Sequence, residues 1–392
     1  MKIFIILSRV PYPLEKGDKL RAFNQIKELS KNNQVYLFAL NDIDSNKDAI
    51  TELLKYCKEV TVFKLTKLTI ILNLIRTLFD GKPFQVGYFY SKKAQRLVDT
   101  LIKKYQPDHI YCQLIRTAEY AKPFTNIPRT LDFMDIFSKG MERRKSTSAF
   151  YMKPVLAIEY NRLLTYENKI FESFTNKTII SDQDKSFFPH PNKEEIVVIP
   201  NGVDTSYFKP MESKKEFEVL FNGNMNYPPN VESVQYLVNK VMPIIWKQKP
   251  QVRLLISGAN PNSKVLELKS DRVVVSGWMN DIRENFAKSK ILAAPMQISI
   301  GLQNKLLEAM AMKLPCVTST LANNALKAKP GEQILVADSP DEYAKNILML
   351  LNDETTLNRI TENGYQYAVN NFNWHNTTQL LEKLFQKSNH SR

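Results

Sequence analysis

Short apolar runs alternate with amphipathic stretches along the whole chain, and this alternation restricts the fold more than any other feature. In one amphipathic stretch, Leu20, Phe23, Ile26 and Leu29 recur at a spacing of three, close to the helical period. Strands that alternate with helices predict parallel sheets covered by helices. The apolar runs predicted as buried strands are 2–7, 34–40, 60–63, 109–114, 128–134, 177–181, 218–223, 252–258, 273–277, 291–296, 315–319 and 333–337.

The alternation starts anew after about residue 215, which predicts two α/β units in tandem. A length of 392 residues agrees with two domains. Pro200 and Pro210 interrupt the pattern at the join. We therefore expect two Rossmann-like domains, 1–204 and 205–372, followed by a helix over 373–392 that packs back toward the first domain.

Cysteine usage and hydropathy exclude several classes of protein. Cys57, Cys112 and Cys316 are widely spaced and form no C-x-x-C pair, so they predict neither a disulfide framework nor a zinc site. The first residues are typical of a strand rather than of a signal peptide. No apolar run reaches the ~18 residues of a membrane-spanning helix. These features predict a cytoplasmic protein that is not integral to a membrane.

Positive charge is concentrated in the first part of the chain. Of the net charge of +14, residues 1–150 contribute +11, with 26 Lys and Arg against 15 Asp and Glu. Anionic lipid and phosphorylated substrates both fit this asymmetry, and so does an ordinary Lys-rich surface. No aromatic and basic recognition motif accompanies the charge, so nucleic acid is not an expected partner.

The segment 291–319 carries the strongest functional signal. An apolar strand ending near Pro295 leads into a helix, whose first amides and positive dipole end can bind an anion. Lys305 and Glu308 lie three residues apart on this helix and therefore on one face. The cation suits a diphosphate and the carboxylate suits ribose hydroxyls. A surface salt bridge is the alternative interpretation of the pair.

Several motifs together carry a resemblance to a known family. The run GLQNKLLEAMAM at 301–312 with PCV at 315–317, the segment 199–210 and the segment 273–296 resemble the C-terminal domain of retaining GT-B glycosyltransferases of family 4, also called group 1. Residues 11–30 and 131–139 resemble the same subgroup, the sugar transferases of bacterial exopolysaccharide and sorting-system loci. The similarity covers nearly the whole chain.

The resemblance implies an α/β GT-B fold, with two Rossmann-like domains facing a central cleft. The second domain would hold a nucleoside-diphosphate sugar of UDP or GDP type, and the first a glycan or lipid-linked acceptor. Transfer would proceed with retention of configuration and without a metal or other cofactor. Two alternatives remain open at this point: a catalytically silent sugar-nucleotide-binding partner subunit, and a nucleotide-sugar 2-epimerase of the same fold.

The resemblance also implies roles for individual residues. Asp132 and Asp135 lie at the end of the predicted strand 128–134 and would be catalytic, although helix capping is an alternative for both. The first glutamate of the family's E-x7-E signature falls on Ile300 here, and the second on Glu308. The residues expected to bind the donor are Gly17, Arg21, Gly223, Asn224, Gly277, Met279, Gly301, Leu302, Lys305 and Glu308.

Two further stretches have patterns that are typical of functional sites. Asp42 and Asp44 imitate a metal-binding D-x-D motif, but a loop is the better interpretation so early in the chain, and no metal site is predicted. Residues 64–84 form an amphipathic pattern with basic flanks, which indicates a helix that lies on an anionic membrane surface at the inner face of the plasma membrane. The alternative is a helix whose apolar face, including Ile71 and Ile75, is packed on the first-domain sheet.

Overall fold

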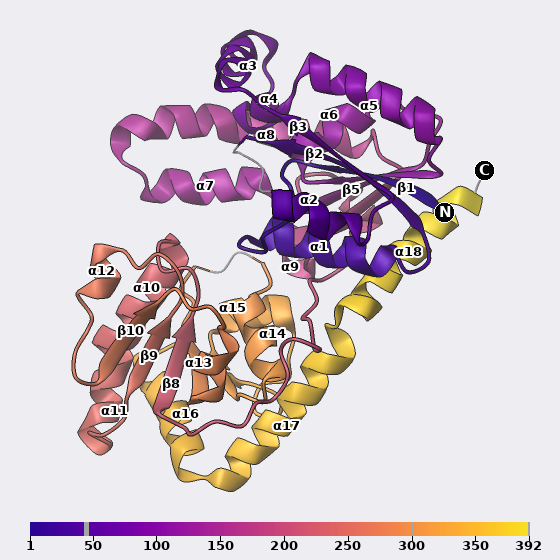
Figure 1. Cartoon of the computed structure of the whole chain (residues 1–392). Coiled ribbons are helices and arrows are strands. Elements are labelled where there is room, and N and C mark those ends of the chain that lie inside the picture. The colour runs from indigo at the N-terminus through magenta and orange to yellow at the C-terminus, as the bar shows by residue number, and fades with distance from the viewer. Residues whose placement is uncertain (43–46, 299–300, 391–392) are drawn as a thin grey trace. The chain divides into compact units, whose positions relative to one another are not determined.

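The computed structural model describes residues 1–42, 47–298 and 301–390 (Figure 1). The chain divides into two compact units. Unit 1 comprises Met1–Pro200 and Trp374–Arg392, and unit 2 comprises Asn201–Asn373. The chain therefore leaves unit 1 once and returns to it.

Unit 1 is built on a parallel sheet with the strand order β3-β2-β1-β4-β5-β6-β7 in the described residues. Its strands are β1 (Lys2–Leu7), β2 (Gln34–Asn41), β3 (Glu59–Lys64), β4 (His109–Gln113), β5 (Arg129–Met134), β6 (Asn176–Ile179) and β7 (Val197–Val198). Its helices are α1 (Gly17–Leu29), α2 (Lys47–Leu54), α3 (Lys67–Asp80), α4 (Phe84–Phe89), α5 (Lys92–Tyr105), α6 (Ala118–Ala121), α7 (Phe137–Thr147), α8 (Lys153–Phe171), α9 (Asp182–Phe187) and α18 (Trp374–His390).

Strand β1 shows why the strands of this sheet are continuously apolar. Successive side chains of a strand point to opposite faces of the sheet. Phe4 and Ile6 belong to one hydrophobic cluster, whereas Ile3 and Ile5 belong to another. Both faces are thus covered, as in other parallel sheets. The predicted strand and helix alternation is confirmed.

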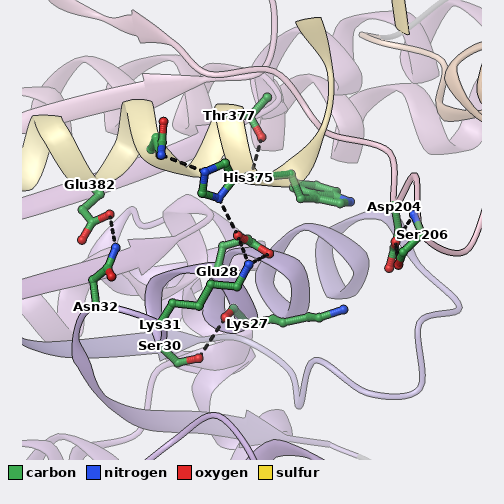
Figure 2. Close-up of polar contacts among 12 residues, drawn as sticks. Lys27, Glu28, Ser30, Lys31, Asn32, Asp204, Ser206, His375, Thr377 and Glu382 are labelled. Atoms are coloured by element: carbon green, nitrogen blue, oxygen red, sulfur yellow. Dashed lines mark hydrogen bonds and ion pairs between the residues drawn. The ribbon is translucent and has the colours of Figure 1, made fainter. Parts of the chain in front are cut away.

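Helix α18 packs against unit 1 beside α1 (Figure 2). The ring of its Phe385 stacks on His109 of β4 with the ring centroids 4.2 Å apart. Polar contacts also join α18 to unit 1. The His375 ring lies 3.1 Å from a Glu28 carboxylate oxygen (Figure 2). Asn33 donates to Glu382 at 2.7 Å. The final helix therefore completes the core of the unit in which the chain began.

Unit 2 repeats the topology with the strand order β10-β9-β8-β11-β12-β13 in the described residues. Its strands are β8 (Phe217–Asn222), β9 (Leu254–Ser257), β10 (Val273–Gly277), β11 (Ser289–Ala294), β12 (Cys316–Thr318) and β13 (Leu335–Val336). Its helices are α10 (Pro228–Tyr236), α11 (Met242–Gln248), α12 (Ser263–Leu266), α13 (Arg283–Ala287), α14 (Asn304–Ala311), α15 (Thr320–Leu326), α16 (Pro340–Asn352) and α17 (Glu354–Asn371). The predicted fold class, two Rossmann-like α/β units, is confirmed.

A buried ion pair joins α1 to the sheet of unit 1. Arg21 Nε donates to Asp132 Oδ2 at 2.6 Å, and neither side chain is exposed to solvent. A second guanidinium nitrogen of Arg21 donates to the Ile199 carbonyl at 2.9 Å. Asp132 also accepts from Tyr111 of β4 at 2.8 Å and from Thr178 of β6 at 3.0 Å. One carboxylate therefore holds together a helix and three strands.

We expect Arg21→Met to lower the free energy of unfolding by about 3–5 kcal/mol, because it leaves the Asp132 carboxylate buried without its cation. Urea denaturation of the full chain measures this change. Lys55→Gln, which breaks the exposed Lys55–Glu52 pair, is the control and should change the free energy of unfolding far less than Arg21→Met. Equal effects of the two substitutions would contradict a structural role for the buried pair.

Candidate functional site

The first candidate site lies in unit 2, where the strand order reverses. β8 has β9 as its neighbour on one side and β11 on the other. The chain continues from β8 to β9 and from β11 to β12, so these two connections lead toward opposite edges of the sheet. Open parallel sheets bind ligands beyond the carboxyl ends of the strands at such a switch point. Helix α14 follows β11 and carries Lys305 and Glu308 in its first two turns. The residue before α14, Gln303, makes no side-chain capping bond to the first amides of the helix.

Two glycines allow the ends of β8 and β9 to approach each other closely. A Cβ atom at Gly258 would lie 1.7 Å from the Gly223 carbonyl oxygen, and Gly258 has a φ of +136°. A Cβ atom at Gly223 would lie 2.6 Å from the Asn230 side chain. Gly223 was predicted from the sequence, whereas Gly258 was missed. Its position directly after the apolar run 252–257 was the signal available for it.

Lys305 is held in a buried position at this end of the sheet. Its Nζ donates to Asn230 Oδ1 at 2.7 Å and lies 4.3 Å from the ring centroid of Phe221. Burial lowers the pKa of Lys305 to about 7, and the nearby Glu308 partly opposes that change. A buried ammonium group that donates to the neutral side chains of Asn230 and Met296 is suited to an incoming anion. Asn230 and Phe221 are thus site residues for which no role was predicted.

Glu308 lies one turn further along α14 and is partly exposed. The surrounding protein removes water from its carboxylate and raises its pKa to about 7, with Lys305 acting in the opposite direction. Among the described residues, no donor lies within hydrogen-bond distance of this carboxylate. The surface salt bridge considered from the sequence is not formed with Lys305. The role of Glu308 in ribose binding stays a prediction.

The other predicted donor residues of unit 2 also lie near the ends of strands or helices. Gly277 ends β10 with a φ of +72°, and Met279 follows in the next loop. Gly301 has a φ of +66°, and both it and Leu302 are buried just before α14. Asn224 is exposed after β8. Ile300 lies outside the described residues.

In unit 1, the structure contradicts two of the predicted site roles. Arg21 and Asp132 have no exposed side-chain surface, because they pair with each other beneath α1. Arg21 therefore offers no atom to a donor, and Asp132 offers none to a reacting group. Both residues are structural. Gly17 is exposed at the start of α1, and its role in donor binding stays a prediction.

Asp135 differs from Asp132 although it is only three residues further along. Met134 ends β5 with a φ of +59°, and Asp135 stands in the turn that follows, partly exposed. Burial, together with the nearby carboxylates of Asp184 and Asp132, raises the pKa of Asp135 to about 7. A carboxyl group that titrates near neutral pH can serve as a general acid or base. Asp135 is therefore the candidate for catalysis in unit 1.

The structure gives no support to a metal site at the discounted D-x-D motif. Asp42 accepts a hydrogen bond from the Tyr88 hydroxyl at 2.9 Å, and Asp44 lies outside the described residues. Within residues 1–42, 47–298 and 301–390, no group of three or more His, Cys, Asp or Glu side chains is arranged to hold a metal ion.

Within the amphipathic stretch 64–84, Lys67–Asp80 form α3, and most of the apolar side chains of this helix face solvent in unit 1. Ile71 is 54% exposed, Ile75 49% and Phe79 86%. The packed side of α3 is narrow: Thr77 is buried against Gly87 of α4, where an added Cβ atom would lie 2.0 Å from Thr77. The alternative in which Ile71 and Ile75 pack on the sheet is wrong. No helix in the described part of the chain has the length and hydropathy needed to span a bilayer.

Comparisons with known proteins agree with this architecture. Residues 216–353 match the family described as "Glycosyl transferases group 1". Over 99% of its length the chain is 22% identical to an uncharacterized 44.6 kDa protein of the cps region of Klebsiella pneumoniae, which is covered completely. It is 24% identical to the UDP-Gal:alpha-D-GlcNAc-diphosphoundecaprenol alpha-1,3-galactosyltransferase of Escherichia coli, over 73% of this chain and 76% of that protein.

Solved structures share the complete fold at low identity. The sucrose-phosphate synthase of Thermosynechococcus elongatus superimposes with a TM-score of 0.71 at 14% identity, covering 100% of both chains. Anabaena HepE in complex with UDP superimposes with a TM-score of 0.67 at 16% identity, covering 99% of this chain and 100% of that one. At these identities the likeness concerns the fold.

We expect stability to depend on pH through Asp135. Because its pKa is raised from 3.8 to about 7, the folded state favours the protonated carboxyl, and this contribution is lost as the pH rises toward 7. Asp135→Asn should therefore gain stability relative to the parent as the pH rises from about 4 to 7, by roughly 1–4 kcal/mol, and the gain should be constant above pH 7. Melting curves across this pH range measure the gain. A constant difference at all pH values would contradict the raised pKa.

Proposed function

We propose that this chain, a group 1 glycosyltransferase with the GT-B fold, transfers a glycosyl unit from a UDP-sugar to a lipid-linked glycan with retention of configuration. The observation that carries the proposal is the pair Lys305 and Glu308 on the first two turns of α14, at the switch point of the unit that matches the group 1 family. A cation beside uncapped helix amides can bind a diphosphate. The carboxylate one turn further can accept hydrogen bonds from ribose hydroxyls.

Charge on the leaving group is the physical problem of the reaction. The bond between the anomeric carbon and the diphosphate oxygen breaks, and the new bond forms to an acceptor hydroxyl oxygen. Lys305 and the first amides of α14 are fixed donors that can stabilise the charge on the departing diphosphate. We assign to Asp135, whose pKa is about 7, the role of the general base that accepts the proton of the acceptor hydroxyl. These groups suffice for a mechanism without a metal ion.

The proposed donor and acceptor classes rest on similar proteins. The name of the Escherichia coli relative specifies a UDP-sugar donor and a diphosphoundecaprenol-linked acceptor, and Anabaena HepE was solved with UDP. The Klebsiella relative lies in a cps region. By analogy, the product of the present reaction would be a lipid-linked intermediate of a bacterial surface polysaccharide.

The surface of unit 1 supports a reaction at a membrane. The exposed apolar side of α3 is accompanied by the exposed cations Lys64 and Lys67. Exposed apolar side chains continue on α8, at Val155 and Ile158. Apolar side chains flanked by cations favour the interface of an anionic bilayer. We therefore assign the enzyme to the inner face of the plasma membrane, bound peripherally.

Glu308→Gln tests the donor site. The substitution keeps the shape of the side chain but removes a charge-assisted hydrogen bond, so the affinity for UDP should fall roughly 10- to 100-fold in calorimetric titrations. Glu267→Gln, an exposed site at the end of α12, is the matched control and should bind UDP like the parent. Unchanged affinity in a folded Glu308→Gln protein would remove the ribose assignment.

The same preparation decides whether the chain is an enzyme. Release of UDP from UDP-galactose or UDP-glucose, measured with EDTA present, is expected for the parent and should be lost in Asp135→Asn while UDP binding stays intact. Donor binding without any turnover, with a range of acceptors, would favour the catalytically silent partner subunit instead.

Cosedimentation with vesicles tests the membrane assignment. The parent should bind vesicles that contain anionic lipid and leave them as salt rises, since each surface cation contributes about 1 kcal/mol. Ile71→Asp should abolish this binding and change the free energy of unfolding by only about 0.5 kcal/mol, because Ile71 is exposed. Leu54→Asp, at an exposed position of α2, controls for the added charge and should bind normally. If the parent does not bind anionic vesicles, the membrane assignment is wrong.

A further inference from the structure

We propose that a pocket of unit 1, lined by Arg9 and Arg116, binds a phosphate group of the acceptor. The pocket has a volume of about 290 Å³. All of its lining residues belong to unit 1, and the sequence predicted no role for either arginine. The residues that line it are Arg9, Asp42, Leu74, Phe84, Gln85, Tyr88, Phe89 and Arg116. The identification of the ligand as an acceptor phosphate rests on the proposed function.

The pocket occupies the position in unit 1 that corresponds to the donor site of unit 2. The strand order reverses at β1, which lies between β2 and β4. Arg9 follows the carboxyl end of β1, Asp42 follows β2, and Arg116 follows β4. Ligands of parallel sheets bind beyond such a reversal. The topology therefore brings two guanidinium groups to the edge of the sheet where a ligand is expected.

Arg116 is a cation without a carboxylate partner in the described part of the chain. One of its Nη atoms donates a hydrogen bond to Gln85 Oε1 at 2.8 Å, and among the described residues its buried Nε has no partner. Its guanidinium lies 5.3 Å from the ring centroid of Phe89 and 4.8 Å from that of Phe137. Burial and the neighbouring charge of Arg9 lower the pKa of Arg116 to about 10, while the carboxylates of Asp18 and Asp42 act in the opposite direction. An anion bound in the pocket would raise the pKa of Arg116 again, because it would stabilise the charged guanidinium.

Arg9 also lies near Phe89, with its guanidinium 6.0 Å from the ring centroid. It forms an ion pair with Asp18 at 3.0 Å and remains about a quarter exposed. Asp42, the acidic residue of the lining, already accepts a hydrogen bond from Tyr88. Arginine offers several N–H donors in a planar group that fits the oxygens of a phosphate. The two arginines thus supply N–H donors of the kind that a phosphate group requires.

The position of the pocket beside α3 indicates where the phosphate comes from. Leu74 of α3 lines the pocket, while Ile71 and Ile75 of the same helix are exposed. A ligand with its phosphate at the arginines could therefore extend its apolar chain along α3. A lipid phosphate combines both chemistries, whereas inorganic phosphate supplies only the first.

Titration with inorganic phosphate tests the pocket itself. The titrations use the full chain carrying Lys305→Gln, which removes the cation of the unit 2 site. In this background we expect Arg116→Gln and Arg9→Gln each to weaken phosphate binding by roughly 10- to 100-fold. Arg96→Gln, on the exposed side of α5, should bind phosphate like the background protein. Equal affinity in all four proteins would overturn the proposal.

A lipid phosphate tests the source of the group. Geranylgeranyl phosphate in detergent micelles should bind more tightly than inorganic phosphate, and Ile71→Asp should reduce that advantage without affecting inorganic phosphate. Equal binding of the two probes would overturn the lipid assignment and leave a site for free phosphate. Arg116→Lys, which keeps the charge, should recover part of the affinity, and its melting curve shows whether loss of binding comes from unfolding.

UDP titration separates this proposal from the proposed function. Arg116→Gln in the otherwise unchanged chain should bind UDP like the parent, because its target is the acceptor. If the parent itself fails to bind UDP, the donor assignment fails while the phosphate result stands. Reduced UDP affinity in a folded Arg116→Gln protein would contradict an acceptor role for the pocket.

Discussion

The buried ion pair between Arg21 and Asp132 is the interaction on which the geometry of unit 1 depends. Removing two charges from water is costly unless their hydrogen-bonding capacity is filled. Here Asp132 accepts from Arg21, Tyr111 and Thr178, so the charge is compensated only when α1, β4, β5 and β6 are all in place. The same network fixes the carboxyl end of β5. It therefore sets the position of Asp135, whose carboxyl group is left partly exposed.

Local sequence pattern predicted the parallel α/β class and the strands other than the short β7, because the central strands are apolar on both faces and the amphipathic helices repeat their own period. It could not predict the partner of Arg21. The two residues of the buried pair are 111 positions apart, and a charged residue near a ligand-binding motif looks the same whether it faces solvent or an opposite charge. Asp132 and Asp135 are likewise alike in sequence. The left-handed turn at Met134 separates their environments, and nothing in the residue types announces it.

The site of unit 2 was more predictable, since Lys305 and Glu308 lie on one short helix whose start could be located from the sequence. The residues that surround the Lys305 ammonium group could not be predicted in the same way, because Asn230 and Phe221 reach it from other elements. The amphipathic pattern of α3 had a similar limit. It identified an apolar face, but the narrow contact at Thr77 and Gly87 determines that this face points away from the core.

The return of α18 to unit 1 has a consequence for how the chain folds during synthesis. Domains usually fold in order as the chain emerges from the ribosome. Unit 1 cannot do so completely, because Leu381 and Phe385, both fully buried in its core, are translated only after all of unit 2. Until then, the apolar surface around His109 and Tyr111 lacks its cover. The half of the protein that is made first is therefore the half that is finished last, and it depends on protection from aggregation in the interval.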